Sequence, residues 1–186
     1  MFQVRIHGRG GQGVVSAAEM LSIAAFEQGK YSQAFPSFGS ERMGAPVVSY
    51  VRIDDEVIEL REPVFEPDLL IIQDPTLFHA VDVFKGMKDD GFVLINSSRK
   101  LDDLGISEAT DKLPAGHVAT ISATELAMQY LKRPMPNTVL LGAFTAMSNV
   151  LELESVEKAI LDKFSGVVGE NNIAAARAAK QATVIC

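Results

Sequence analysis

The sequence predicts an α/β fold, a three-layer sandwich built around a mostly parallel, mixed sheet with a Rossmann-like, glycine-rich first turn. Two observations support this fold class. Short apolar runs alternate with longer stretches of helical period along the 186 residues. A glycine-rich segment also follows the first apolar run directly. Because no internal repeat, low-complexity tract or linker interrupts the chain, we expect residues 1–186 to form a single domain.

Each predicted strand is a short apolar run bounded by turn residues. Residues 46–53, a turn at Asp54-Asp55 and residues 56–61 predict a hairpin, which would add antiparallel pairs to the sheet. Residues 69–73 are apolar on both faces, as expected of a buried parallel strand. The full set of predicted strands is 2–6, 46–53, 56–61, 69–73, 92–95 and 118–121.

The predicted helices rest on apolar residues of helical period and on signals at the helix ends. In residues 14–28 the apolar positions share one stripe, and Gly29 ends the helix. Ser122 and Glu125 predict a capping box. Residues 30–45 show neither the helical nor the strand periodicity of apolar residues and therefore predict a long loop. Ordered loops of this length are uncommon and usually have a function. Helices are predicted over 14–28, 74–85, 123–131, 137–150 with Asn137 or Thr138 as cap, 155–164 with Ser155 as cap, and from Asn171 onward.

Composition excludes several classes of function. The net charge is −7, which argues against a nucleic-acid partner. The single cysteine, Cys186, cannot hold an iron–sulfur cluster or a disulfide framework by itself, and the three histidines lie too far apart in sequence to suggest a metal site. No apolar run is long enough to cross a membrane, and the first residues lack the order of a signal peptide. We therefore expect a cytoplasmic protein without a membrane partner.

The segment between the first predicted strand and helix fits the pattern G-x-G-x-x-G at glycines 8, 10 and 13. Backbone amides at such a turn favour an anion, and Arg9 can add a charge-assisted contact to a phosphate. A nicotinamide or flavin dinucleotide site also needs an acidic residue about 20 positions later, and residues 32–37 contain none. The alternative is that the glycines merely allow the helix to pack close to the sheet.

The loop PSFGSERMGAP carries hydroxyls, glycines and an arginine that together suit an anion or a carboxylate. We interpret Ser37, Ser40 and Arg42 as contacts to a ligand or a partner. A solvated, exposed loop with a Glu41–Arg42 pair is the alternative. The strand ends at 74–76, 96–98 and 122–124 add donors to the same sheet edge but no convincing catalytic base, and we expect no catalytic or metal-ligating residue.

Three stretches, GRGGQGVVSAAEML, FPSFGSERMGAPV and PDLLIIQDPTL, resemble the gamma subunit of 2-oxoacid:ferredoxin oxidoreductases, specifically the pyruvate type. The resemblance runs from Phe2 through MPNTVLLGAF and covers nearly the whole chain. It implies a complex that converts a 2-oxoacid, coenzyme A and oxidised ferredoxin to acyl-CoA, carbon dioxide and reduced ferredoxin. Thiamine diphosphate, magnesium and 4Fe–4S clusters would reside on the alpha, beta and delta partner subunits. The gamma chain would be an α/β module involved in coenzyme A access.

Combining the motif with the resemblance, we expect this chain to assist assembly and to contact coenzyme A. Two alternatives stay open: a stand-alone protein that binds NAD(P) or FAD, and a purely structural assembly subunit. The residues expected to contact coenzyme A are Gly8, Arg9, Gly10, Gly11, Gln12, Gly13, Ser37, Ser40 and Arg42.

Overall fold

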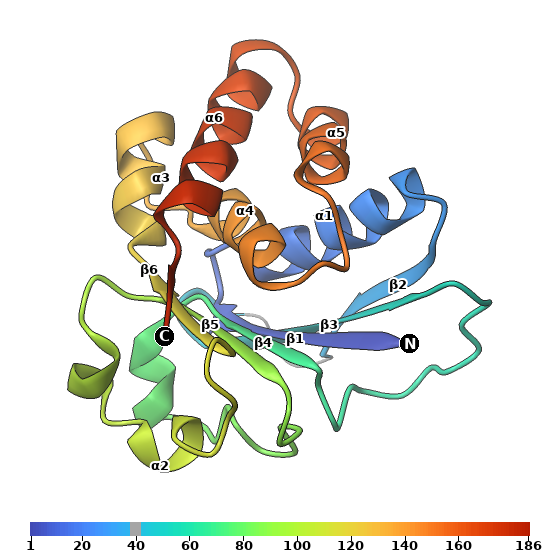
Figure 1. Cartoon of the computed structure of the whole chain (residues 1–186). Helices are drawn as coiled ribbons and strands as arrows, with labels where there is room; N and C mark the ends of the chain where they lie inside the picture. The colour runs from blue at the N-terminus through green and yellow to red at the C-terminus, as the bar shows by residue number, and fades with distance from the viewer. Residues whose placement is uncertain (38–41) are drawn as a thin grey trace.

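Within residues 1–37 and 42–186, which the computed structural model describes, seven strands form one mixed sheet in the order β2-β3-β1-β4-β5-β6-β7 (Figure 1). The centre of the sheet is parallel, because β1 pairs with β4, β4 with β5 and β5 with β6 in that sense. Antiparallel pairs flank it, with β3 between β1 and β2 on one side and β7 beside β6 on the other. The strands are β1 (Phe2–Arg9), β2 (Tyr31–Pro36), β3 (Pro46–Asp54), β4 (Leu69–Ile72), β5 (Phe92–Asn96), β6 (Val118–Ile121) and β7 (Val184–Ile185).

The two faces of the sheet are covered by different kinds of structure (Figure 1). The longer helices share one face, and the other face carries α2 with the 3-10 turns η1 and η2. The former are α1 (Val14–Glu27), α3 (Ala123–Leu131), α4 (Asn137–Met147), α5 (Leu153–Lys163) and α6 (Gly166–Ala182); the latter are η1 (Pro75–His79), η2 (Leu101–Leu104) and α2 (Ser107–Thr110).

The sheet residues divide between two hydrophobic cores, as the alternation of a β-strand requires. In β4, Leu69 and Ile71 join the core under the helices, whereas Leu70 and Ile72 join the smaller core on the opposite face. Both sets are buried, which explains why this strand is apolar throughout. The predicted α/β fold and mixed sheet are confirmed.

The helical layer is held together by close backbone approaches. Gly142 of α4 faces the backbone of α6 so closely that an added Cβ would lie 2.0 Å from the Ala176 carbonyl oxygen. Thr138 of α4 also donates its hydroxyl to the Asn172 side chain of α6 at 2.7 Å. These contacts fix the position of the start of α4, which lies beside the start of α1.

Four element predictions are wrong, each because of a long-range partner. The helix predicted from Asn171 to the end of the chain stops at Ala182, and Val184–Ile185 form β7 because they pair with β6. Residues 31–36 form β2 rather than a loop, because they pair with β3 along their whole length. Residues 56–61 form no strand, since β1 and β2 already occupy both edges of β3. The helix predicted over 74–85 is only the turn η1.

Side chains explain why residues 80–85 leave the helical path. Arg5 of β1 donates to the carbonyl oxygens of Val83 and Lys85 at 2.9 and 2.6 Å. A helix would direct those carbonyls along its own axis.

Several predicted caps are also wrong. Ser122 makes no side-chain cap, and Asn96 instead accepts a hydrogen bond from the Thr124 amide at 3.2 Å. Asn137 lies inside α4, which likewise has no side-chain cap. Asn171 lies inside α6, and Ser155 inside α5, where its hydroxyl donates to the Gln28 side chain at 2.6 Å.

Candidate functional site

The glycine-rich bend lies where β1 passes into α1, at the carboxyl edge of the parallel strands. β1 ends at Arg9, α1 begins at Val14, and Gly13 adopts a left-handed conformation with φ 72°. The order of strand, turn and helix and the start of the helix are as predicted, but the strand is three residues longer than the predicted 2–6 and includes Gly8 and Arg9. Ligands of open α/β sheets gather at this edge.

The last part of the predicted loop folds back onto the bend, which the sequence did not show. The Gly10 amide donates to the Ala45 carbonyl at 2.9 Å, and the Gly44 amide donates to the Gly10 carbonyl at 3.0 Å. Gly10 and Met43 form a short parallel bridge. Residues 42–45 therefore cover one side of the bend and bring Arg42 to it.

Close packing accounts for two of the glycines. A Cβ at Gly10 would lie 2.2 Å from the Arg42 carbonyl oxygen, and one at Gly13 would lie 2.6 Å from Nδ2 of Asn137. Close packing thus requires glycine at these two positions, but against residues 42–43 and the start of α4 rather than between α1 and the sheet, as the alternative interpretation expected. Close packing of these glycines does not exclude a bound ligand. The packing restricts the Cα atom of each glycine, whereas a ligand would accept a hydrogen bond from a backbone N–H.

Some backbone amides of the bend donate hydrogen bonds within the protein, and others do not. Those of Arg9, Gly10 and Gln12 are satisfied by the Gln12 side chain, the Ala45 carbonyl and the Arg9 carbonyl. Among the described residues, no such partner meets the amides of Gly11 and Gly13. The helix that follows has no side-chain cap and no acidic residue in its first turn. Its N-terminal partial positive charge is therefore uncompensated.

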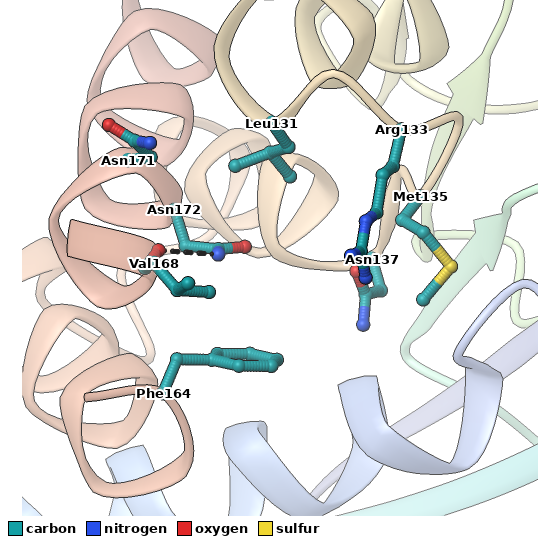
Figure 2. Close-up of a pocket in the computed structure, with 8 residues that line it drawn as sticks. All are labelled: Leu131, Arg133, Met135, Asn137, Phe164, Val168, Asn171 and Asn172. Carbon is teal, nitrogen blue, oxygen red and sulfur yellow. Dashed lines mark hydrogen bonds between the residues drawn. The ribbon is translucent and has the colours of Figure 1, made fainter. Parts of the chain in front are cut away.

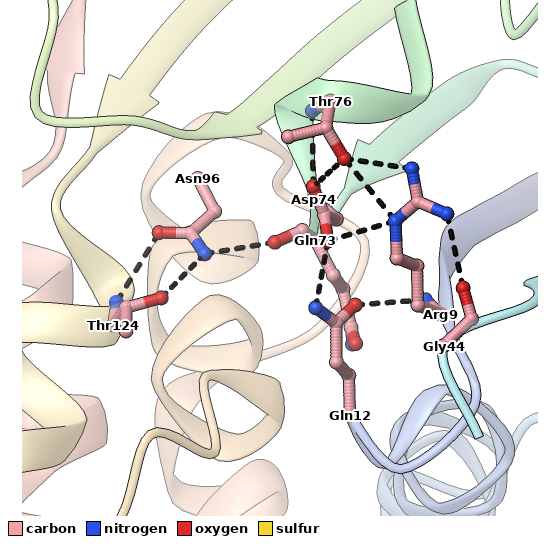
Figure 3. Close-up of polar contacts among 8 residues, drawn as sticks. All are labelled: Arg9, Gln12, Gly44, Gln73, Asp74, Thr76, Asn96 and Thr124. Carbon is pink, nitrogen blue, oxygen red and sulfur yellow. Dashed lines mark hydrogen bonds and ion pairs between the residues drawn. The ribbon is translucent and has the colours of Figure 1, made fainter. Parts of the chain in front are cut away.

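Arg9 is held by a polar network (Figure 3). Its guanidinium donates to the Thr76 hydroxyl at 2.8 Å and to the Gly44 carbonyl at 3.0 Å, and it pairs with the Asp74 carboxylate at 3.2 Å. Asp74 also accepts from the Thr76 amide at 2.9 Å and from the Gln12 side chain at 2.9 Å. The expected role of Arg9 as a free phosphate contact is therefore modified, because its charge is already shared with Asp74.

The network also sets the protonation of Asp74. Burial alone would raise the pKa of the Asp74 carboxyl, but hydrogen bonds from Thr76 and Gln12 and the charge of Arg9 outweigh burial and hold that pKa below its ordinary value. Asp74 is consequently an anion that stabilises the bend, and its side chain also caps η1 by accepting a hydrogen bond from the Thr76 amide.

A second polar chain ties the neighbouring strands together at the same edge. The Asn96 side chain donates to the Gln73 carbonyl at 2.8 Å and to the Thr124 hydroxyl at 2.8 Å. The Gln73 side chain is buried, and neither its nitrogen nor its oxygen has a hydrogen-bond partner among the described residues. Sequence reasoning missed Gln73, because only its position at the end of a buried strand distinguishes it.

His7 is a structural residue beneath the bend. Arg5 donates from Nε to Nε2 of His7 at 3.0 Å, and both side chains are buried. Burial, followed by the neighbouring Arg5 charge, lowers the pKa of His7 from 6.5 to about 3. The ring is therefore neutral at ordinary pH and accepts a hydrogen bond.

The remaining predicted residues lie further out. Ser37 is exposed, and its amide donates to the Val48 carbonyl at 2.8 Å. Arg42 is exposed beside the bend, whereas Ser40 lies outside the described residues. In the described part of the chain, no three acidic, histidine or cysteine side chains cluster as they would around a metal ion. None of the helices there is both long and apolar enough to cross a membrane.

Residues 3–182 match the family model described as pyruvate ferredoxin/flavodoxin oxidoreductase. The chain belongs to this family. A relative from Thermococcus kodakarensis, the pyruvate/ketoisovalerate oxidoreductases common subunit gamma, is 45% identical over 185 residues that cover 100% of this chain and 98% of that protein. The crystal structure of the pyruvate oxidoreductase subunit PORC from Thermotoga maritima has a TM-score of 0.83 and 35% identity, covering 98% of this chain and 97% of that one.

A longer chain shares the fold at lower identity. The 2-oxoglutarate:ferredoxin oxidoreductase from Magnetococcus marinus, solved with 2-oxoglutarate, coenzyme A and succinyl-CoA bound, matches 100% of this chain with 32% of its own chain. Its TM-score is 0.75 and its identity 19%, so this likeness concerns the fold alone. The predicted family and the assignment as a gamma-type oxidoreductase subunit are confirmed by the full-length matches.

Proposed function

We propose that this family member assembles with alpha, beta and delta chains and assists both that assembly and the access of coenzyme A. The partner chains would hold thiamine diphosphate, magnesium and the iron–sulfur clusters, and ferredoxin would accept the electrons. The observation that carries the proposal is the match to gamma subunits over nearly the whole of both chains. A single cysteine agrees with this division, because an iron–sulfur cluster needs several thiolates.

The proposed substrate is a 2-oxoacid, with pyruvate as the first candidate. The Thermococcus relative is named for both pyruvate and ketoisovalerate, and the Thermotoga neighbour for pyruvate. Nothing in the glycine-rich bend recognises one oxoacid over another. Selection among oxoacids would therefore belong to the partner chains.

For coenzyme A, the proposed contact is the start of α1. The amides of Gly11 and Gly13 and the uncapped first turn of the helix present hydrogen-bond donors and a partial positive charge. Arg42 beside the bend can add a guanidinium, whereas Arg9 contributes through the network that fixes the bend. The Magnetococcus neighbour, which shares this fold over 32% of its own chain, was solved with coenzyme A bound, and this agrees with a coenzyme A role for such complexes.

A substitution at Ser16 tests the coenzyme A contact without disturbing the bend. Ser16 is half-buried at the third position of α1, where an acidic residue normally stabilises a helix by about 0.3–1 kcal/mol. We expect Ser16→Glu to preserve or raise stability and to raise the dissociation constant for coenzyme A at least tenfold, because the carboxylate competes with phosphate.

Ser16→Gln is the matched control, since it has the same size without the charge. Calorimetric titration of the assembled complex gives the two dissociation constants. Equal values for the Glu and Gln variants would contradict phosphate binding at α1. Substitutions at Gly10 are less informative, because any side chain there meets the Arg42 carbonyl.

The loop residues Ser37, Ser40 and Arg42 are proposed to dock against the partner chains or to close over their active site. Arg42 is exposed at the edge of the bend, where a partner can reach it. We expect Arg42→Ala to weaken assembly or to raise the KM for coenzyme A. Unchanged complex mass together with unchanged KM would refute this part of the proposal.

The dinucleotide alternative lacks its geometric requirement. In a dinucleotide-binding fold, the acidic ribose ligand ends the strand next to the first one. Here the antiparallel strand β3 separates β1 from β2, and β2 carries no carboxylate. The parallel neighbour of β1 is β4, and the carboxylate that follows it, Asp74, already pairs with Arg9 and accepts hydrogen bonds from Thr76 and Gln12. If the Ser16→Glu and Ser16→Gln variants bound coenzyme A with equal affinity and both assembled normally, a purely structural role would be favoured instead.

A further inference from the structure

A small cavity lies between the start of α4, the start of α6 and the segment that joins α3 to α4 (Figure 2). Its volume is about 200 Å³. Pockets that hold drug-sized ligands usually measure about 300–1,000 Å³, so this one suits a smaller molecule. Leu131, Phe164 and Val168 supply apolar walls, and no carboxylate lines the cavity. Arg133 and Asn137 lie on one side of the cavity beside Met135, and Phe164 and Val168 lie on the other side with Asn172.

Two of those polar groups are unused within the described part of the chain. Arg133 forms no ion pair there. The Asn137 residue is 3% exposed, and its side-chain amide has no hydrogen-bond partner among the described residues. The Asn137 amide lines the cavity and is not among the side-chain groups sealed from solvent without a partner, so it can form a hydrogen bond with a ligand or a water there. Figure 2 shows the Arg133 guanidinium beside the Asn137 amide on one side of the cavity.

The opposite wall is fixed in place. Asn172 accepts a hydrogen bond from the Thr138 hydroxyl at 2.7 Å and donates to the Val168 carbonyl at 2.8 Å. Both of its polar atoms are therefore occupied within the protein. The ligand-binding capacity lies with Arg133, Asn137 and the amides at the start of α4, a helix without a side-chain cap or an acidic first turn.

We infer that this cavity binds a short-chain carboxylate, an anion with a small alkyl group. A guanidinium pairs with a carboxylate through two parallel hydrogen bonds, and the Asn137 amide supplies a further donor. The alkyl group would contact Phe164 and Val168. Inorganic phosphate can pair with the Arg133 guanidinium but has no alkyl group to contact the apolar residues of the cavity. The site is distinct from the proposed phosphate contact at α1 but adjoins it, because a Cβ at Gly13 would lie 2.6 Å from Nδ2 of Asn137.

Titration of the full chain with sodium isobutyrate at constant ionic strength tests the inference. Binding is monitored by the NMR chemical shifts of methyl groups that line the cavity. Isobutyramide, with the same shape and no charge, and inorganic phosphate are the comparison ligands. We expect isobutyrate to saturate the shifts with a dissociation constant on the order of 1 mM, and each comparison ligand to bind at least tenfold more weakly.

Variants of the lining residues test whether isobutyrate binds in this cavity. Arg133→Gln should weaken isobutyrate at least tenfold, and Val168→Phe should block binding by filling the cavity from its rim, since Val168 is 57% exposed and tolerates a larger side chain. Lys132→Gln is the matched control, because it removes a neighbouring exposed charge whose Nζ donates to the Gln129 carbonyl outside the cavity.

Five outcomes decide the inference. Saturable isobutyrate binding that is lost in the Arg133 and Val168 variants but retained in the Lys132 variant supports it. Absence of saturation in the native chain, or equal affinity in Arg133→Gln, overturns it. Phosphate binding as strong as that of isobutyrate also overturns it, since the alkyl group would then contribute nothing. A response to coenzyme A alone would overturn it as well, while leaving the proposed function intact.

Discussion

His7 provides a quantitative test of the packing beneath the glycine-rich bend. The residue is 5% exposed, and Arg5 donates to its Nε2, so the ring proton is on Nδ1. Protonation would replace an accepted hydrogen bond by a contact between two cations. For these reasons the pKa of His7 falls from 6.5 in the unfolded chain to about 3 in the folded one.

The direction of the pH effect follows from this difference. Between about pH 6.5 and pH 3 the unfolded chain binds a proton that the folded chain does not, so stability falls as the pH falls. One unit of pKa corresponds to about 1.4 kcal/mol. The contribution of neutral His7 is therefore complete above about pH 6.5 and has decreased by about 2 kcal/mol at pH 5 and about 3 kcal/mol at pH 4.

His7→Gln removes the titration and keeps a hydrogen-bond acceptor near the position of Nε2. Because the chain has no tryptophan, urea unfolding is best followed by circular dichroism. We expect the native chain to be more stable than the variant at neutral pH, and this difference to shrink by about 2 kcal/mol by pH 5. His79→Gln, at an exposed histidine, is the matched control. A difference that stays constant from neutral pH to pH 4 would refute the buried, neutral ring.

Two further substitutions test other contacts of the fold and the site. Gly142→Ala places a methyl group 2.0 Å from the Ala176 carbonyl and should destabilise the chain by about 1–3 kcal/mol through separation of α4 and α6; an unchanged urea midpoint would contradict this packing. Asp74→Asn should cost about 1–2 kcal/mol at neutral pH by weakening the hydrogen bonds of Thr76, Gln12 and Arg9. Because the pKa of Asp74 is lowered in the folded chain, its advantage over Asn is lost as the pH falls below its ordinary value of 3.8, and a pH-independent difference would argue against the network.

The parts of the fold that local pattern specifies were predictable. Buried strands such as β4 and β5 are continuous apolar runs, and α1 has a clear apolar stripe with glycines at both ends. By contrast, β2 is an edge strand with both faces partly exposed, so it lacks the alternation that marks a strand. The absence of a strand at 56–61 depends on the pairing of β3, which the segment itself does not encode.

In the candidate site, too, some features follow from the local sequence pattern and others depend on contacts between distant segments. The position of the bend follows from the spacing of its glycines after an apolar run. The coverage of the bend by residues 42–45 depends on contacts between distant segments, as do the pairing of Arg9 with Asp74 and the unpartnered amide of Gln73. Such side chains become recognisable only when the sheet brings the ends of several strands to one edge.

The most direct test of the central claim is native mass spectrometry of the tagged chain purified from cells that also make its partner chains, combined with an assay of ferredoxin reduction by 2-oxoacid and coenzyme A. We predict a stoichiometric complex in which this chain accompanies subunits that carry thiamine diphosphate and iron–sulfur clusters, and no ferredoxin reduction by the chain alone. Recovery of the chain without any such partner, or reduction of ferredoxin by the isolated chain, would contradict the account.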